Sequence, residues 1–262
     1  MRFEDTYFFR CANNPYIRFP KPWDTYFTLP LSVPLSEWLC KTRLTPNTIS
    51  VLSLLVAFVA AAFFYRGDHV SLILGALSFQ LSYILDCADG YVARKKNLAS
   101  PLGHWIDHTF DEIKKPVLLI ALLMGQDALD HVAPWGWIAA LLYIFSRVLV
   151  KTDSTVKGTG EGASVGRDLQ RVGTSGMLLT SRQAWLFRHF GIVILFTSIE
   201  AQALTFVVGP VTGHPLTFIL ISALLSIAWF LYVDGFRYWQ RVLRAAARAE
   251  HHDHQDVGRA NI

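Results

Sequence analysis

The sequence predicts an all-α, polytopic integral membrane protein with six transmembrane helices and an N-terminal interfacial amphipathic segment. Hydrophobic residues make up 52% and charged residues 17% of its 262 residues, a composition that excludes an ordinary soluble domain. Several apolar runs approach the roughly 20 residues that a helix needs to cross a bilayer. Lysine and arginine are concentrated in alternate connections between these runs, as in proteins that cross a membrane repeatedly.

Residues 1–44 are expected to form the interfacial, juxtamembrane segment. Aromatic and basic residues are mixed throughout this region. Its part from Trp23 to Lys41 is interrupted by Pro30 and Pro34, so we expect it to lie on the membrane surface and not to span. The alternative is an N-terminal extension that packs on the protein without contacting lipid.

Residues 45–240 are expected to form the six-helix domain, followed by a polar cytoplasmic tail at 241–262. Thr45 is a suitable N-cap for the first span, and Pro46 suits its first helical position. The expected spans, with approximate bounds, are 46–65, 70–94, 101–124, 135–150, 185–208 and 215–238. The polar connection 151–183 lacks the spacing of a phosphate-binding loop and is expected to be a flexible linker.

The positions of basic residues predict the orientation of the spans. The connections after spans one, three and five contain Arg66 and almost no other basic residue. Because cytoplasmic connections are enriched in lysine and arginine, both termini are expected in the cytoplasm. The turn between spans two and three would then be cytoplasmic as well.

Two pairs of aspartates flank that turn. Asp86 and Asp89 are three residues apart at the end of span two, and Asp107 and Asp111 are four apart at the start of span three. Both spacings place the two side chains on one face of a helix. Four carboxylates gathered at one depth repel one another and require cations, for which hard divalent metals are suitable.

An ion-pair network is the structural alternative for these aspartates. It would draw on the nearby basic residues, which are Arg94, Lys95, Lys96, Lys114 and Lys115. Such a network explains neither the two helical pairs nor the glycines beside them. Gly90 and Gly103 would let a ligand approach the backbone closely, and Arg94 can bind a phosphate oxygen. Together these residues suggest a substrate that carries a diphosphate.

The pattern Asp86-x2-Asp89-Gly90-x2-Ala93-Arg94-x8-Gly103-x3-Asp107-x3-Asp111 resembles the signature of the CDP-alcohol phosphotransferase family at all eight defining positions. The likeness covers about residues 40–240. It implies a six-helix fold, a homodimer, and transfer of a substituted phosphate from a CDP-linked donor to an alcohol acceptor with release of CMP. At least one reactant would be a membrane lipid, and no nucleic-acid partner is expected.

The resemblance also implies roles for individual residues. Asp86, Asp89 and Asp107 would hold two Mg²⁺ or Mn²⁺ ions, and Asp111 would act as a ligand and as the general base. On the nucleotide side, Gly90 and Ala93 would lie against the cytidine and Arg94 would support the diphosphate, with Gly103 in the same group. Relatives often have a lysine directly after the last aspartate, whereas here Glu112 and Ile113 precede Lys114.

The sequence leaves the two substrates open. The donor is expected to be CDP-diacylglycerol or a related CDP-alcohol; the alternative is a soluble donor of the choline or ethanolamine type with a lipid acceptor. A phosphorylated acceptor would need basic side chains near the metals; the alternative explanation for each candidate is the ordinary positive-inside bias. The candidates are Arg147, Lys151, Lys157, Arg167, Arg171 and Arg182.

Two more distant hypotheses remain. UbiA-type prenyltransferases also use intramembrane aspartates, but their two acidic motifs normally lie far apart, whereas these pairs fall within 26 residues. Divalent-cation transporters place carboxylates near the bilayer midplane, not at a helix end. In span five, Glu200 and Gln202 are expected to face the interior of the bundle.

Overall fold

A computed structural model of the chain describes Tyr7 and residues 22–127, 134–159 and 196–232, without side-chain detail at 149–159. The regular elements in these ranges are all helices, and they include no strand. The predicted tail at 241–262 and most of residues 1–21 lie outside the described residues. The all-α prediction is therefore confirmed for the part of the chain that the structure describes.

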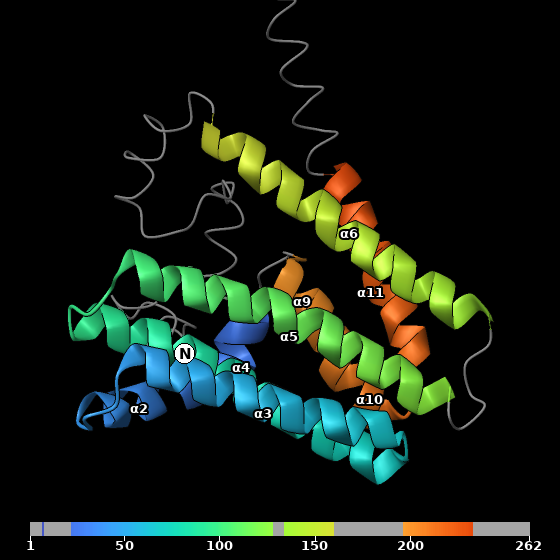
Figure 1. The fold of residues 1–262 in the computed structure, drawn as a ribbon. Helices are drawn as coiled ribbons and strands as arrows, with labels where there is room; N and C mark the ends of the chain where they lie inside the picture. Colours follow the sequence, from blue (N-terminus) through green and yellow to red (C-terminus); the bar gives the residue numbers. More distant parts are fainter. Residues whose placement is uncertain (1–6, 8–21, 128–133, 160–195, 233–262) are drawn as a thin grey trace, which may run out of the picture.

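Three long helices that are consecutive in the chain form one half of the bundle. They are α3 (Pro46–Arg66), α4 (His69–Lys95) and α5 (Pro101–Asp127). α3 contacts both α4 and α5 along its length, and the short connections make neighbouring helices antiparallel (Figure 1). The other half pairs α6 (Pro134–Thr159) with α11 (Pro215–Phe230). Between the halves lie α9 (Ser198–Ala203), η4 (Leu204–Val208) and α10 (Gly209–Thr212).

Local signals at the helix ends explain several boundaries. The Thr45 hydroxyl accepts a hydrogen bond from the Thr48 N–H at 3.3 Å, and Pro46 occupies the first turn, which confirms the predicted start of α3. Gly67 ends α3 with a φ of 76°, a conformation that glycine adopts without steric cost. The Asp68 carboxylate then caps α4 by accepting from the Ser71 N–H at 3.0 Å.

The core lies where η4 meets the three long helices. Phe206 of η4 is fully buried and packs against Phe79 of α4 and Phe64 of α3, with ring centroids 5.1 and 6.3 Å apart. Small residues let the helices approach closely: a Cβ on Gly125 would lie 2.1 Å from the Phe64 carbonyl oxygen. α3 and α5 are therefore in close contact near Gly125.

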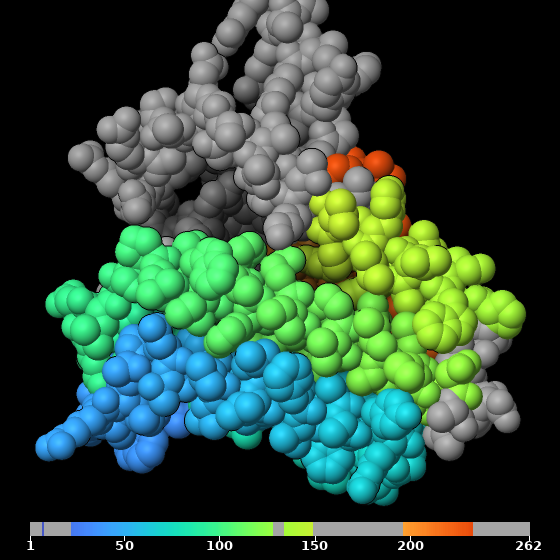
Figure 2. Space-filling model, viewed as in Figure 1, coloured from blue at the N-terminus to red at the C-terminus, as the bar shows by residue number. Residues whose placement is uncertain are grey.

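The outer surface of the long helices is apolar. α3 and α4 are the two described helices that are both long enough and apolar enough to cross a membrane, whereas α11 is apolar but has 16 residues. Large apolar side chains are exposed along α3, α5 and α6, whose outer faces form one continuous surface in Figure 2. Because water disfavours such a surface, lipid is the suitable surrounding. Six spans remain a prediction.

The N-terminal segment forms a helix that packs on the bundle. η2 (Asp24–Thr28) and α2 (Leu29–Cys40) lie against α4 and bury small polar side chains such as Ser32 and Ser36. Phe27 and Trp38 remain exposed on the opposite face. The segment thus contacts the protein with one face and presents an apolar face outward. It therefore packs on the protein, as in one expected arrangement, and has an outward apolar face that suits a membrane surface, as in the other.

Polar contacts fix α2 and η2 to α4. Tyr83 donates to the Asp24 carboxylate at 2.8 Å, and the Trp23 indole N–H donates to Gln80 at 3.2 Å. Tyr91 and Lys95 both donate hydrogen bonds to Glu37. These bonds lower the pKa of the Glu37 carboxyl, and the bond from Lys95 has the larger effect. The N-terminal segment is therefore held beside the end of α4 that carries the aspartates.

Two predicted boundaries were wrong. α6 continues to Thr159 and does not end near Val150, so part of the predicted linker is helical. The polar residues after Val150 mark the end of the apolar run, but polarity does not end a helix. The expected fifth span is interrupted at Thr197, which has an extended backbone and caps a new helix with Glu200 in a capping box. Residues 185–195 lie outside the described part.

We predict that Gly125→Ala destabilises the protein by about 1–3 kcal/mol, because the added methyl group would overlap the backbone of α3. Thermal unfolding in detergent would measure this loss. Met124→Ala is the matched control, since Met124 is exposed on the same turn and its truncation should change stability by less than about 0.5 kcal/mol. Equal stability of Gly125→Ala and the wild type would contradict this close helix contact.

Candidate active site

The two aspartate pairs lie at one end of the bundle. α4 ends at Lys95, and a short turn containing Asn97, with a φ of 56°, leads to the start of α5 at Pro101. Because the helices are antiparallel, the last turns of α4 face the first turns of α5. The first turn of α3 borders the same region.

Three of the four carboxylates converge. Asp86, Asp89 and Asp107 each offer one oxygen, and these oxygens all lie within 4.8 Å of one another. Asp89 is buried and accepts a hydrogen bond from the Ser50 hydroxyl of α3. Hard divalent cations bind carboxylate oxygens at about 2.0–2.6 Å, so one ion can bridge oxygens separated by such distances. The donor set therefore fits a divalent metal ion.

Asp111 lies outside this group of three. One of its oxygens is 3.6 Å from the Lys114 ammonium, and the other is 3.1 Å from that of Lys115. Lys114 is buried, contacts Asp86 as well, and donates to the Ser53 hydroxyl at 3.0 Å. The expected ion-pair alternative is thus present in part, on the side of Asp86 and Asp111.

Two other basic residues of that alternative have different partners. Lys95 pairs with Glu37 of α2. Lys96 donates to the backbone carbonyls of Thr42 and Leu44 at 2.8 and 3.2 Å. These contacts tie the end of α4 to the N-terminal segment and leave Asp89 and Asp107 facing a cavity.

The cavity has a volume of about 250 Å³ and borders the carboxylate group. Asp89 and Asp107 form part of its wall. All four residues expected on the nucleotide side also line it, namely Gly90, Ala93, Arg94 and Gly103. A Cβ on Gly103 would lie 3.1 Å from the Ser100 hydroxyl and 3.3 Å from the Asn47 amide oxygen. At Gly90 it would lie 3.1 Å from a guanidinium nitrogen of Arg94. The missing Cβ at both glycines therefore lets neighbouring polar side chains lie close to the backbone of this wall.

Several residues of this wall were not predicted from the sequence. Asn47 and Ser50 come from the first turns of α3, and Ser100 and His104 come from the start of α5. The one available signal was their position next to a helix N-terminus at the expected cytoplasmic end. That signal is shared by many capping residues and could not single them out.

The two polar residues expected to face the interior have different roles. Gln202 borders a second cavity of about 20 Å³, together with Asp86, Asp111 and Lys114. Glu200 instead caps α9 by accepting from the Thr197 N–H at 2.7 Å, and it also accepts from the Trp23 N–H at 3.2 Å. Gln202 thus lies beside the acidic residues, whereas Glu200 links the N-terminal segment to α9.

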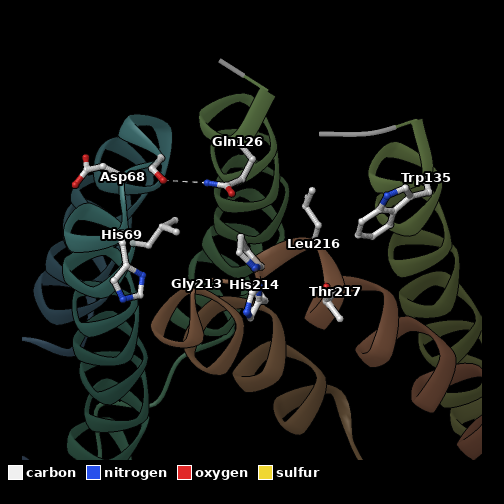
Figure 3. Close-up of a pocket in the computed structure, with 11 residues that line it drawn as sticks. Asp68, His69, Gln126, Trp135, Gly213, His214, Leu216 and Thr217 are labelled. Atoms are coloured by element: carbon white, nitrogen blue, oxygen red, sulfur yellow. Dashed lines mark hydrogen bonds between the residues drawn. The ribbon is translucent and has the colours of Figure 1, made fainter. Parts of the chain in front are cut away.

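A larger cavity of about 450 Å³ lies at the opposite end of the bundle (Figure 3). Its wall includes His69, His214 and Trp135, and Gln126 there donates to the Gly67 carbonyl at 3.1 Å. Among the described residues, the acidic group that can hold a metal is the one at the α4–α5 end. The larger cavity has the single carboxylate of Asp68 in its wall, so within the described part of the chain a converging group of carboxylates borders a cavity of ligand size only at the α4–α5 end.

Parts of the sequence are similar to a phosphatidyltransferase and to two other enzymes. A CDP-diacylglycerol–glycerol-3-phosphate 3-phosphatidyltransferase from Rickettsia typhi is 34% identical over 87 residues, which cover 33% of this chain and 48% of that protein. An archaetidylinositol phosphate synthase from Pyrococcus horikoshii is 25% identical over 91 residues, covering 35% and 47%.

A third relative is longer. The bifunctional IPC transferase and DIPP synthase from Thermococcus kodakarensis is 36% identical over 120 residues, covering 46% of this chain and 26% of that protein. The matched region thus spans about half the length of the first two relatives and about a quarter of the third.

The match to a protein family is more extensive than the match to any of these three relatives. The CDP-alcohol phosphatidyltransferase family matches residues 43–198, which is more than half of the chain and includes all four aspartates. The carboxylate group, the glycine-lined cavity and this match agree, and the chain belongs to the CDP-alcohol phosphatidyltransferase family.

Proposed function

We propose that the protein transfers a substituted phosphate group from a CDP-linked donor, CDP-diacylglycerol or a related CDP-alcohol, to an alcohol acceptor, with release of CMP, in phospholipid biosynthesis. The observation that carries this proposal is the convergence of Asp86, Asp89 and Asp107 at the wall of a cavity of about 250 Å³. A nucleotide diphosphate needs cations beside its phosphates and a wall that the nucleoside can approach closely. The carboxylates can hold such cations, and Gly90 and Gly103 line the wall.

Asp86, Asp89 and Asp107 would hold two Mg²⁺ or Mn²⁺ ions, with Asp111 as a further ligand. When bound, such ions neutralise negative charge that develops on the diphosphate oxygens and the leaving CMP. Ser50 supports this arrangement by donating a hydrogen bond to Asp89 from α3. The hydroxyl thereby fixes one carboxylate and leaves the other oxygen of Asp89 available.

Gly90, Ala93 and Gly103 would accommodate the cytidine, since they line the cavity with little side-chain bulk. Arg94 lines the same wall one turn after Gly90, and its guanidinium would bind oxygens of the diphosphate. The donor's phosphorus would then lie at the carboxylate end of the cavity.

The reaction is a substitution at the phosphorus that carries the donor's alcohol group. The acceptor oxygen forms a bond to this phosphorus. At the same time the bond between this phosphorus and the oxygen that bridges the diphosphate breaks, and its electron pair leaves with CMP. Asp111 would take the proton of the acceptor hydroxyl, as a carboxylate one turn beyond Asp107. Its two oxygens lie 3.6 Å from the Lys114 ammonium and 3.1 Å from the Lys115 ammonium.

A phosphorylated acceptor is supported by Arg147 of α6. Arg147 is half-buried, and one of its guanidinium nitrogens is buried with no hydrogen-bond partner among the described residues. An unpaired buried N–H is costly, and an acceptor phosphate would satisfy it. The names of two relatives, which refer to glycerol 3-phosphate and archaetidylinositol phosphate, agree with an acceptor of this class.

The membrane arrangement is part of the same proposal. Six spans with cytoplasmic termini would place the carboxylate group at the cytoplasmic face, where nucleotides and Mg²⁺ are available. The amphipathic segment before Thr45 would lie at the interface, with the exposed Phe27 and Trp38 in lipid. A homodimer is expected. The candidates Arg167, Arg171 and Arg182 lie outside the described residues, as do the side chains of Lys151 and Lys157.

The substrates can be identified by measuring CMP release from the purified full-length protein. We expect release from CDP-diacylglycerol with glycerol 3-phosphate or inositol phosphate, dependent on Mg²⁺ or Mn²⁺. CDP-choline and CDP-ethanolamine with diacylglycerol form the alternative arm. Release only in that arm would show that the donor is soluble and the acceptor is the lipid. No CMP in either arm would refute the proposed reaction.

Asp86→Asn and Asp89→Asn are each expected to weaken Mg²⁺-dependent CDP binding by at least about tenfold, because each removes a charge from the carboxylate group. Isothermal titration at limiting Mg²⁺ would measure this. Asp68→Asn, at the opposite end of α4, is the matched control, and an asparagine there can still cap the helix. Wild-type affinity in both cluster variants would count against the assignment of metal ligands.

Asp111→Asn is expected to lower the turnover number by about a hundredfold or more, since the acceptor hydroxyl loses its base. CDP binding should remain close to that of the wild type, because Asp111 lies outside the group of three. Single-turnover assays together with CDP titrations separate these effects. Full turnover in this variant would exclude Asp111 as the base.

Arg147→Met is expected to raise KM for a phosphorylated acceptor by at least about tenfold, with little change in donor affinity. Steady-state kinetics with the acceptor varied would measure it. Arg66→Met is the control, because Arg66 is exposed at the far end of α3. A KM that changes equally in both variants would show that Arg147 does not bind the acceptor.

A further inference from the structure

The cluster of aspartates contains a cation that the chain itself supplies. Lys114 is only 7% exposed, and its ammonium contacts Asp86, lies 3.6 Å from Asp111 and donates to Ser53 at 3.0 Å. A buried ammonium is costly unless ionised and polar partners surround it. These three partners are sufficient to hold Lys114 in place.

The contacts of Lys114 divide the four aspartates unequally. Asp86 is shared between Lys114 and the group of three carboxylates, whereas Asp89 and Asp107 form no ion pair within the described part of the chain and line the cavity. The side of Asp86 and Asp111 thus already has a positive charge. A divalent ion at Asp89 and Asp107 meets no such competitor, but a second ion between Asp86 and Asp111 would meet the ammonium directly.

We propose that Lys114 is an internal counterion that competes with the second divalent ion, so that the two ions bind with unequal affinity. This inference rests on the proposed function, because it assumes that the cluster holds metal ions. In this arrangement Lys114 stabilises the metal-free cluster, and the second ion binds only when the ammonium leaves the side of Asp86 and Asp111. Lys114 is a positioning residue and not a catalytic one.

The surroundings of Lys114 allow such a displacement. The cavity of about 20 Å³ beside it is lined by Tyr83 and Gln202 as well as by Asp86 and Asp111. Its volume is comparable to that occupied by a single water molecule, for which about 10–15 Å³ is needed. The ammonium can therefore shift into this space, whose wall combines polar side chains with the apolar Phe79 and Leu118.

Lys115 provides a control within the same helical turn. It lies 3.1 Å from Asp111 and 3.9 Å from Glu112, but it has no ion pair with Asp86. Its side chain is 29% exposed, compared with 8% for Lys114. Because solvent screens the charge of exposed side chains, removal of Lys115 should affect ion binding less than removal of Lys114.

The test is a titration of the full chain in detergent with Mn²⁺, in which electron paramagnetic resonance measures the concentration of free Mn²⁺. The wild type is expected to show a tighter and a weaker class of Mn²⁺ site. Lys114→Met should tighten the weaker class by at least about tenfold, because the competing charge is removed. Lys115→Met should tighten it by less than about threefold. Mn²⁺ should also raise the unfolding temperature more in Lys114→Met than in the wild type.

Ser53→Ala serves as a second variant that keeps the charge of Lys114 and removes its hydroxyl partner. We expect it to tighten the weaker class by about two- to fourfold. The inference is overturned if folded Lys114→Met leaves that class unchanged or weakens it. If Lys114→Met does not fold, unchanged Mn²⁺ affinity in Ser53→Ala overturns it. Absence of any Mn²⁺ binding in the wild type would instead refute the metal site of the proposed function.

Discussion

Repulsion among carboxylates held close together is the constraint on which the site depends. Asp86, Asp89 and Asp107 have oxygens within 4.8 Å of one another, and Asp89 is almost fully buried. Like charges at such distances separate or bind cations unless the backbone prevents their movement. The chain offsets part of the charge with the Ser50 hydroxyl and the Lys114 ammonium. The remaining charge, open to the cavity, is what makes a divalent cation and a diphosphate suitable ligands.

The two ends of the bundle differ in how closely their helices approach one another. At the end away from the aspartates, Gly125 brings α5 into contact with the backbone of α3, and aromatic rings around Phe206 fill the core. At the other end, Gly90 and Gly103 leave a space of about 250 Å³ between the helices. The N-terminal segment fixes the end of α4 through Glu37 and its contacts with Tyr91 and Lys95. Contacts of α3 with α5 and of α2 with α4 thus hold the helix ends that carry the carboxylates in position.

Much of this half of the bundle could be predicted from the sequence, because its signals are local. Thr45, Pro46 and the polar residues around Gly67 determine the bounds of α3. The spacing of the aspartates predicted four carboxylates gathered at one end, of which three converge in the structure. Features that depend on tertiary contacts could not be predicted in this way. Ser50 reaches Asp89 across 39 positions of sequence, and Lys114 reaches Asp86 across 28. The break at Thr197 lay within an apolar run, where hydropathy alone does not reveal a new helix start.

The central claim is that Asp86, Asp89 and Asp107 together bind a divalent ion that contacts a cytidine nucleotide. A crystal structure of the full chain with Mn²⁺ and CDP, with the ion located by anomalous scattering, tests it most directly. The account predicts a Mn²⁺ peak at about 2.0–2.6 Å from oxygens of these three aspartates and from the diphosphate. The cytidine should lie against Gly90 and Gly103. A nucleotide bound elsewhere, or no ion between the three carboxylates at saturating Mn²⁺, would contradict it.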